Sequence, residues 1–140
     1  MATKVFLDAN VILDFVLKRN KYEMVRSIFM LEEQQKIKLF VSSSILHIIS
    51  YWLTKNLGST VAKTTLLKFL DHIKVVEGNH ESSVKALESN FTDIEDALQY
   101  FTALLNKMDY VVSFDKGFQK FNSDKLQIID AQTLVSLFKL

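Results

Sequence analysis

The sequence predicts an α/β protein, a three-layer αβα sandwich in which helices cover both faces of a central, mostly parallel sheet of four to five strands. Short apolar runs that suit buried strands alternate with longer segments of helical spacing, and this alternation is typical of βα units with parallel pairing. Hydrophobic residues make up 49% of the 140 residues, enough for one sizeable core. The sequence contains no repeat, low-complexity tract or linker. We therefore expect one domain over residues 1–140.

Five short apolar segments are the predicted strands. The first ends at an aspartate and leads through a turn into a helix that contains Val11 and Leu13. The predicted strands are residues 5–7, 39–41, 75–76, 110–112 and 126–129.

Capping residues mark most predicted helix ends, because the chain has no proline and only three glycines. Asn20, with Glu23 three residues later, resembles a capping arrangement for the second helix. The serines at 42–44 offer an N-cap for the third helix.

The middle of the chain carries two further helix boundaries. Gly58 closes the third helix, and Ser59 or Thr60 caps the fourth. Thr92 with Glu95 forms the clearest capping box in the sequence, ahead of a helix with one apolar face. After the first helix, helices are expected at about residues 24–32, 45–53, 61–70, 81–88, 94–105, 116–121 and 131–138.

The composition argues against several kinds of site and location. The chain has no cysteine, and its three histidines lack metal-ligand spacing, so disulfides, thiolate chemistry and zinc binding are not expected. No stretch approaches the roughly 18 uncharged apolar residues that span a bilayer. Residues 1–4 run into the first apolar segment without a cleavage-like signal. We therefore expect a cytoplasmic protein with no membrane contact.

The net charge of +1 neither indicates nor excludes nucleic-acid binding. If several of the sixteen acidic residues surround metal ions, the remaining surface carries a basic surplus. Basic residues flank the segments that carry the candidate acids, although lysines that only serve solubility explain them equally well. They are Lys18, Arg19, Lys21, Lys116, Lys120 and Lys125.

Aspartates follow two predicted strands, at the sheet edge where ligands of such folds bind. Asp8 comes directly after the first strand, and Asp115 follows strand 110–112 by a short turn. Asp96 lies near the start of the sixth helix, three residues after Asp93 and therefore next to it on the helix surface. Clustered carboxylates repel one another unless cations neutralise them. An oxygen-only ligand set favours Mg²⁺ or Mn²⁺.

Each of these acids also has a purely structural explanation. Asp8 can cap the next helix, Asp93 can interact with the helix dipole, and Asp115 can start a turn beside Gly117. Three acids at one predicted edge nevertheless favour a metal site.

Three segments resemble the PIN domain family, occur in that family's order and extend over nearly the whole chain. Residues 6–14 (FLDANVILD) resemble the first strand with its metal-binding aspartate. Residues 93–99 (DIEDALQ) resemble the helix with the third acid, and residues 111–118 (VVSFDKGF) resemble the strand and turn with the last acid.

This resemblance implies a role for each matched residue. The expected metal ligands, which are also the expected catalytic residues, are Asp8, Asp96 and Asp115. Asn10 would orient Asp8 or a bound water, and Ser113 would position the last acid or a phosphate. Asp93 and Asp14 would support the site from nearby, although an exposed helical aspartate explains Asp14 equally well.

The sequence departs from the family at one position. Family members carry a glutamate in the helix after the second strand, but this chain has Ile48 there. Isoleucine cannot bind a cation. His47 points about 100° away around the helix, so it replaces the glutamate only if the alignment shifts by one residue.

The resemblance implies a Mg²⁺- or Mn²⁺-dependent endoribonuclease similar to the toxins of bacterial toxin–antitoxin pairs. In such enzymes water attacks the phosphodiester phosphorus and leaves 5′-phosphate and 3′-hydroxyl ends. The implied partners are RNA, an inhibitory antitoxin protein and a second copy in a homodimer. Tyr22, Tyr51 and Trp52 suit either an interface or the core.

Two alternatives remain open at this stage. The first is a catalytically weakened or inactive PIN-like module that binds RNA or protein, which Ile48 suggests. The second is a phosphate-handling enzyme or receiver domain in which Asp8 is the nucleophile. The phosphatase pattern has a second aspartate where this chain has Asn10, which argues against it.

Overall fold

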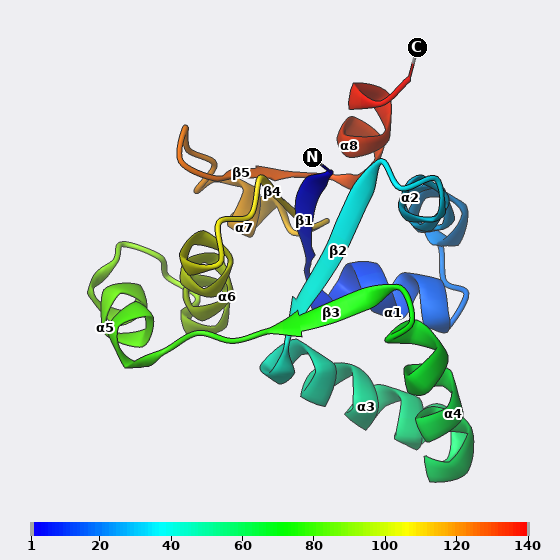
Figure 1. Cartoon of the computed structure of the whole chain (residues 1–140). Helices are drawn as coiled ribbons and strands as arrows, with labels where there is room; N and C mark the ends of the chain where they lie inside the picture. Colours follow the sequence, from blue (N-terminus) through cyan, green and yellow to red (C-terminus); the bar gives the residue numbers. More distant parts are fainter. Residues whose placement is uncertain (1, 140) are drawn as a thin grey trace.

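Five parallel strands form one sheet in the order β3-β2-β1-β4-β5 in the computed structural model, which describes residues 2–139 (Figure 1). The strands are β1 (Thr3–Leu7), β2 (Ile37–Ser42), β3 (Ile73–Val76), β4 (Tyr110–Val112) and β5 (Gln127–Ile129). The helices are α1 (Ala9–Val16), α2 (Tyr22–Glu33), α3 (Ser43–Leu57), α4 (Ser59–Phe69), α5 (His80–Glu88), α6 (Ile94–Leu105), α7 (Lys116–Gln119) and α8 (Ala131–Leu137). The predicted α/β class is confirmed.

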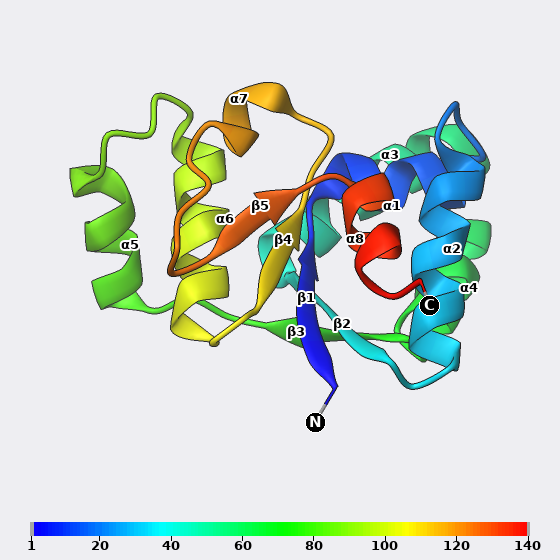
Figure 2. The ribbon, with the colours of Figure 1, turned by 90° about the horizontal axis from the view of Figure 1, so that it is seen from above.

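Helices lie on both sides of the sheet and complete three layers. Helices α5 and α6 lie on one side, and α1 to α4 with α8 lie on the other (Figure 2). The chain therefore changes side after β3, when it crosses back over β2 and β1 to reach β4.

The central strand shows why the sheet needs both helical layers. In β1, Val5, Phe6 and Leu7 are all fully buried, although successive side chains of a strand point to opposite faces. A continuous apolar run is typical of a parallel strand that is covered on both sides. Each face of β1 therefore contributes to the core.

Several predicted helix ends are confirmed. Ser42 caps α3, because its Oγ accepts a hydrogen bond from the Ile45 backbone N–H at 3.1 Å. Gly58 ends α3 with φ +82° and ψ 160°, a conformation that essentially only glycine adopts.

Three predicted N-caps are wrong. Helix α6 is capped by Asp93, whose Oδ1 accepts the Asp96 backbone N–H at 2.9 Å, and not by Thr92 one residue earlier. Asn20 does not cap α2, which begins after Lys21. Gly58 itself precedes the first residue of α4, so neither Ser59 nor Thr60 is its cap. Adjacent polar residues satisfy the same capping pattern, and packing of the helix decides which is used.

Candidate functional site

The candidate site lies where β1 and β4 end. Asp8 follows β1 and caps α1, and its backbone N–H donates to the Val112 carbonyl at 3.0 Å. Asp115 follows β4 and caps α7. The helix after β1 belongs to one layer, and the chain leaves β4 toward the other, so these strand ends are the topological switch point at which such folds bind ligands.

Asp8 is a buried carboxylate held by two hydrogen bonds. Its side chain accepts the Ala9 backbone N–H through Oδ1 and the Ser113 hydroxyl through Oδ2, both at 2.8 Å. Ser113 is fully buried, and its Oγ also accepts the Asp115 backbone N–H at 3.1 Å. The serine therefore joins the first and last acids of the predicted set. The structural explanation of Asp8 as a helix cap is confirmed, because its Oδ1 accepts the Ala9 backbone N–H at the start of α1.

Asp93 and Asp96 lie at the start of α6 and interact electrostatically with Asp8. Burial, as the largest cause, and the negative charges of Asp93, Asp8, Asp115 and Glu95 together raise the pKa of Asp96 to about 7. The pKa of Asp8 is raised by burial and by Asp115 and Asp93, against the lowering effect of its Ser113 and Ala9 hydrogen bonds. The acids therefore share one electrostatic environment.

Glu95 belongs to this environment, although the sequence pattern indicated only a capping role for it. Burial raises the pKa of Glu95, and the charges of Asp8 and Asp93 add to the effect. The signal in the sequence was its position between Asp93 and Asp96, in the first turn of the same helix.

Two residues of the predicted set make no side-chain hydrogen bond to these acids within residues 2–139. Asn10 is exposed in the first turn of α1. Asp14, further along α1, forms an ion pair with Arg19 at 2.8 Å, and it is not among the acids that raise the pKa of Asp8 or Asp96.

The start of α3 contains no acid that replaces the family's glutamate. Ile48 is half-buried against the core, and His47 is exposed. Instead, the buried Gln99 of α6 accepts the Ser42 hydroxyl at 2.6 Å and donates to Ser44 Oγ at 2.8 Å. This network, which the sequence pattern did not indicate, ties the start of α3 to α6 one turn after Asp96.

The donor set suits a hard divalent cation, because all its members are carboxylates. The pKa values of Asp8 and Asp96 are raised mainly by burial, and no basic side chain is among the causes that shift them. Within residues 2–139, however, no three His, Asp or Glu side chains lie close enough together to hold a metal ion. In this arrangement the acids are near one another but do not form a complete coordination shell for a cation.

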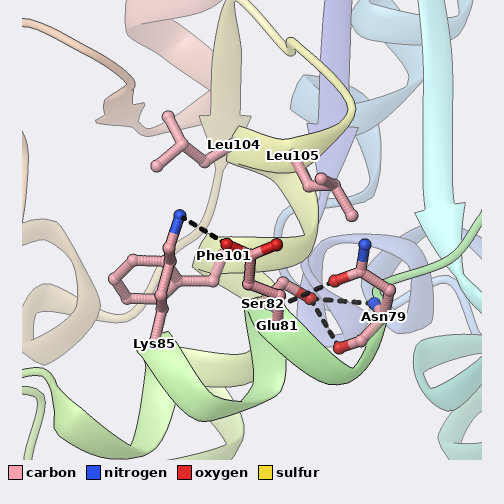
Figure 3. A pocket seen from close by; sticks show the side chains of 7 residues that line it. All are labelled: Asn79, Glu81, Ser82, Lys85, Phe101, Leu104 and Leu105. Atoms are coloured by element: carbon pink, nitrogen blue, oxygen red, sulfur yellow. Dashed lines mark hydrogen bonds and ion pairs between the residues drawn. The ribbon is translucent and has the colours of Figure 1, made fainter.

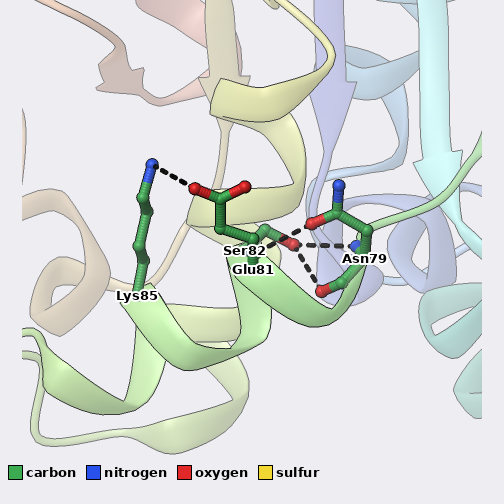
Figure 4. Close-up of polar contacts among 4 residues, drawn as sticks. All are labelled: Asn79, Glu81, Ser82 and Lys85. Atoms are coloured by element: carbon green, nitrogen blue, oxygen red, sulfur yellow. Dashed lines mark hydrogen bonds and ion pairs between the residues drawn. The ribbon is translucent and has the colours of Figure 1, made fainter.

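A separate pocket lies between α5 and the far half of α6 (Figure 3). It has a volume of about 210 Å³, an apolar wall of Phe101, Leu104 and Leu105, and a polar rim. The polar groups of the rim bind one another (Figure 4). Asn79 and Ser82 form a reciprocal capping box, and Lys85 Nζ forms an ion pair with Glu81 Oε1 at 3.8 Å. This pocket is therefore part of the α5–α6 packing and not of the acidic site.

Within the described residues, no helix combines the length and hydrophobicity that a membrane span requires.

The fold and the edge acids define a class of parallel α/β proteins with a carboxylate site at the point where the strand order reverses. The sequence model of the PIN domain family matches residues 4–117. The chain therefore belongs to the PIN domain family, which confirms the resemblance seen in the sequence.

Individual proteins agree with this assignment. The chain is similar to Ribonuclease VapC1 of Aquifex aeolicus (strain VF5), with 29% identity over 123 residues that cover 82% of this chain and 83% of that protein. Its fold is similar to a chain in the DNA-bound VapBC structure from Salmonella typhimurium, with a TM-score of 0.71, 18% identity and coverage of 92% and 98%. It is also similar to Mycobacterium tuberculosis VapC20, a sarcin-ricin loop cleaving toxin, with a TM-score of 0.64, 12% identity and coverage of 83% and 93%.

Proposed function

We propose that this protein is a Mg²⁺- or Mn²⁺-dependent endoribonuclease and the toxin of a toxin–antitoxin pair. The observation that carries the proposal is the convergence of Asp8, Asp96 and Asp115 on one environment at the ends of β1 and β4. The names of its relatives, Ribonuclease VapC1 and the sarcin-ricin loop cleaving VapC20, support the choice of RNA as substrate.

The carboxylates of Asp8, Asp96 and Asp115 would hold the cation, with Asp93 and Glu95 adding negative charge beside it. A bound Mg²⁺ or Mn²⁺ lowers the pKa of a water molecule and stabilises charge on the scissile phosphate. Ser113 keeps Asp8 in a fixed orientation and holds the backbone of Asp115 next to it. Because the side chains are not close enough to bind an ion as they stand, Asp96 and the exposed Asp115 would turn toward Asp8 on binding.

The partners proposed are RNA, an antitoxin protein and a second copy of this chain, with the cytoplasm as the place of action. The VapBC structures among its structural neighbours support an antitoxin partner. Tyr51 and Trp52 of α3 support a protein interface, since they are 58% and 41% exposed and pack edge to face at 5.3 Å. Tyr22 gives less support, because it is half-buried and stacks on Phe15.

A nuclease assay with Mn²⁺ on single-stranded RNA tests the proposal. The parent protein is expected to cleave, whereas Asp8→Asn and Asp96→Asn lose at least about 10- to 100-fold in rate, because loss of a residue that only supports a metal ligand already costs about that much. Asp71→Asn is the matched control, an exposed aspartate just before β3 at the opposite edge of the sheet. Equal background cleavage by all four proteins would refute the proposed ribonuclease activity.

Ile48 favours a second candidate, a PIN domain that binds RNA or protein without efficient cleavage. Ile48→Glu distinguishes the two candidates, with Ile48→Gln as an uncharged control of the same size. An inactive parent that gains cleavage with Ile48→Glu but not with Ile48→Gln would show that the natural chain has lost a ligand. A parent that already cleaves, with no gain from the glutamate, supports the enzyme.

A further inference from the structure

The basic residues between α1 and α2 differ in what their charges contact. Arg19 is paired with Asp14 at 2.8 Å. Lys18 lines an apolar hollow among α1, α2 and α4, together with Phe15 and Tyr22. Lys21 alone of the three points to the strand ends, where its Nζ lies 4.8 Å from the centre of the Phe114 ring.

Phe114 links this ammonium group to the acidic site. It occupies the turn between Ser113, which holds Asp8, and Asp115, which caps α7. The ring is half-buried against the core, so it forms a fixed platform. A cation over an aromatic face is attracted by the ring electrons, which favours this orientation of an otherwise flexible side chain. The position of Lys21 is therefore set relative to the site.

The other neighbour of Lys21 is Asp130, which follows β5 and caps α8 at the same edge of the sheet. Its pKa is lowered mainly by hydrogen bonds from Thr133 and also by the charge of Lys21. None of the ion pairs within residues 2–139 involves Lys21. The exposed ammonium group therefore keeps N–H donors for an anion from solution.

We propose that Lys21 binds a phosphate of the RNA backbone on the β4–β5 side of the acidic site. The inference rests on the proposed function and adds a residue that positions the RNA strand. A negatively charged substrate has to approach a cluster of carboxylates, and a cation over the ring of Phe114, the residue before Asp115, offsets that repulsion for the neighbouring phosphate. Lys21 is therefore a positioning residue that holds RNA next to Asp115 and takes no part in bond cleavage.

The salt dependence of RNA binding tests this role directly. The probe is a fluorescein-labelled single-stranded RNA of mixed sequence, with Mg²⁺ present and all variants in an Asp96→Asn background that blocks the proposed cleavage. Lys21→Met removes the charge and keeps the apolar stem. Lys55→Met is the matched control, because Lys55 also lies over an aromatic ring, that of Trp52 at 5.2 Å, but on α3. Lys21→Arg restores the charge.

Each phosphate contact contributes about 0.7 to the slope of log K against log salt for a single strand. We expect Lys21→Met to reduce the slope by about 0.7, and Lys55→Met and Lys21→Arg to leave it unchanged. In cleavage assays without the background substitution, Lys21→Met should raise KM and leave kcat nearly the same.

If the Asp96→Asn protein binds RNA and Lys21→Met leaves its salt-dependence slope unchanged, the role of Lys21 is overturned. The proposed nuclease function is not affected by that result. The same holds for an equal loss with Lys55→Met, or for a fall in kcat at constant KM. If the parent neither binds nor cleaves RNA, the proposed function fails and this inference fails with it.

Discussion

Asp96 lies in the first turn of α6, where burial and four neighbouring acids raise its pKa to about 7, well above the ordinary value of 3.8. Between these two values the folded protein binds more protons than the unfolded chain, so the free energy of unfolding falls as the pH rises. Above pH 7 both states are ionised and the penalty stays constant. The metal-free protein is therefore destabilised by its own site at neutral pH.

Asp96→Asn should remove this penalty. In EDTA, the melting temperature of the variant should exceed that of the parent by an amount that grows from about pH 4 to pH 7 and then remains level. Thermal denaturation followed by circular dichroism checks this. Asp71→Asn, at an exposed aspartate outside the site, is the control, and a difference between Asp96→Asn and the parent that does not grow over this pH range would contradict the assignment.

Ser113 is the second residue on which the site depends. Its fully buried hydroxyl donates to Asp8 and accepts from the Asp115 backbone, so Ser113→Ala leaves a buried carboxylate oxygen without its donor. We expect the free energy of unfolding to fall by about 1–3 kcal/mol. Urea denaturation measures the change, with the exposed Ser136→Ala as a control. A loss equal to the control would mean that Ser113 does not hold Asp8.

At the scale of elements, helix ends place the acids, and the sequence predicts them unevenly. Short apolar runs correctly predict all five strands, and in β1 and β2 these runs are buried. The bounds of α6 were correct but its predicted N-cap was wrong by one residue, since Thr92 and Asp93 are both good caps and only the packed helix selects Asp93.

Helix α6 also illustrates a contact that no local pattern contains. Gln99 bonds to Ser42 and Ser44, which lie 57 and 55 residues earlier in the chain. Gln99→Ala should lower the free energy of unfolding by about 1–3 kcal/mol, because two serine hydroxyls lose a buried partner. Urea denaturation tests this against Gln119→Ala, whose side chain bonds to the Ser113 carbonyl in the less buried α7. A smaller loss for Gln99 than for Gln119 would contradict its role between α3 and α6.

Gly58 connects α3 to α4 at φ +82° and ψ 160°. A Cβ added there would meet no described atom within 4 Å, so any loss in Gly58→Ala reports backbone strain alone. We expect about 1–3 kcal/mol from equilibrium unfolding. Ser59→Ala, at the exposed next residue, is the control, and a Gly58→Ala variant as stable as the parent would show that the turn adapts.

At the scale of the whole molecule, the function depends on strand order. The sequence indicates that Asp8 and Asp115 follow strands, but their proximity arises because β4 pairs with β1 and not with β3, its predecessor in the chain. Residue patterns alone do not determine which strands pair. The family resemblance predicted that Asp8, Asp96 and Asp115 lie at one site. The environment of Glu95, the hydrogen bonds of Gln99 and the contact of Lys21 with Phe114 were seen only in the three-dimensional structure.

Binding of Mn²⁺ measured by isothermal titration calorimetry at pH 8 tests the central claim that these acids form one cation site. The parent is expected to bind Mn²⁺, with proton uptake by the buffer that increases as the pH is lowered toward 7, because Asp96 must be ionised to act as a ligand. Asp8→Asn, Asp96→Asn and Asp115→Asn should each weaken binding by about 10- to 100-fold, and Asp71→Asn should not. Equal affinity in all of these proteins, or no binding by the parent, would contradict the account.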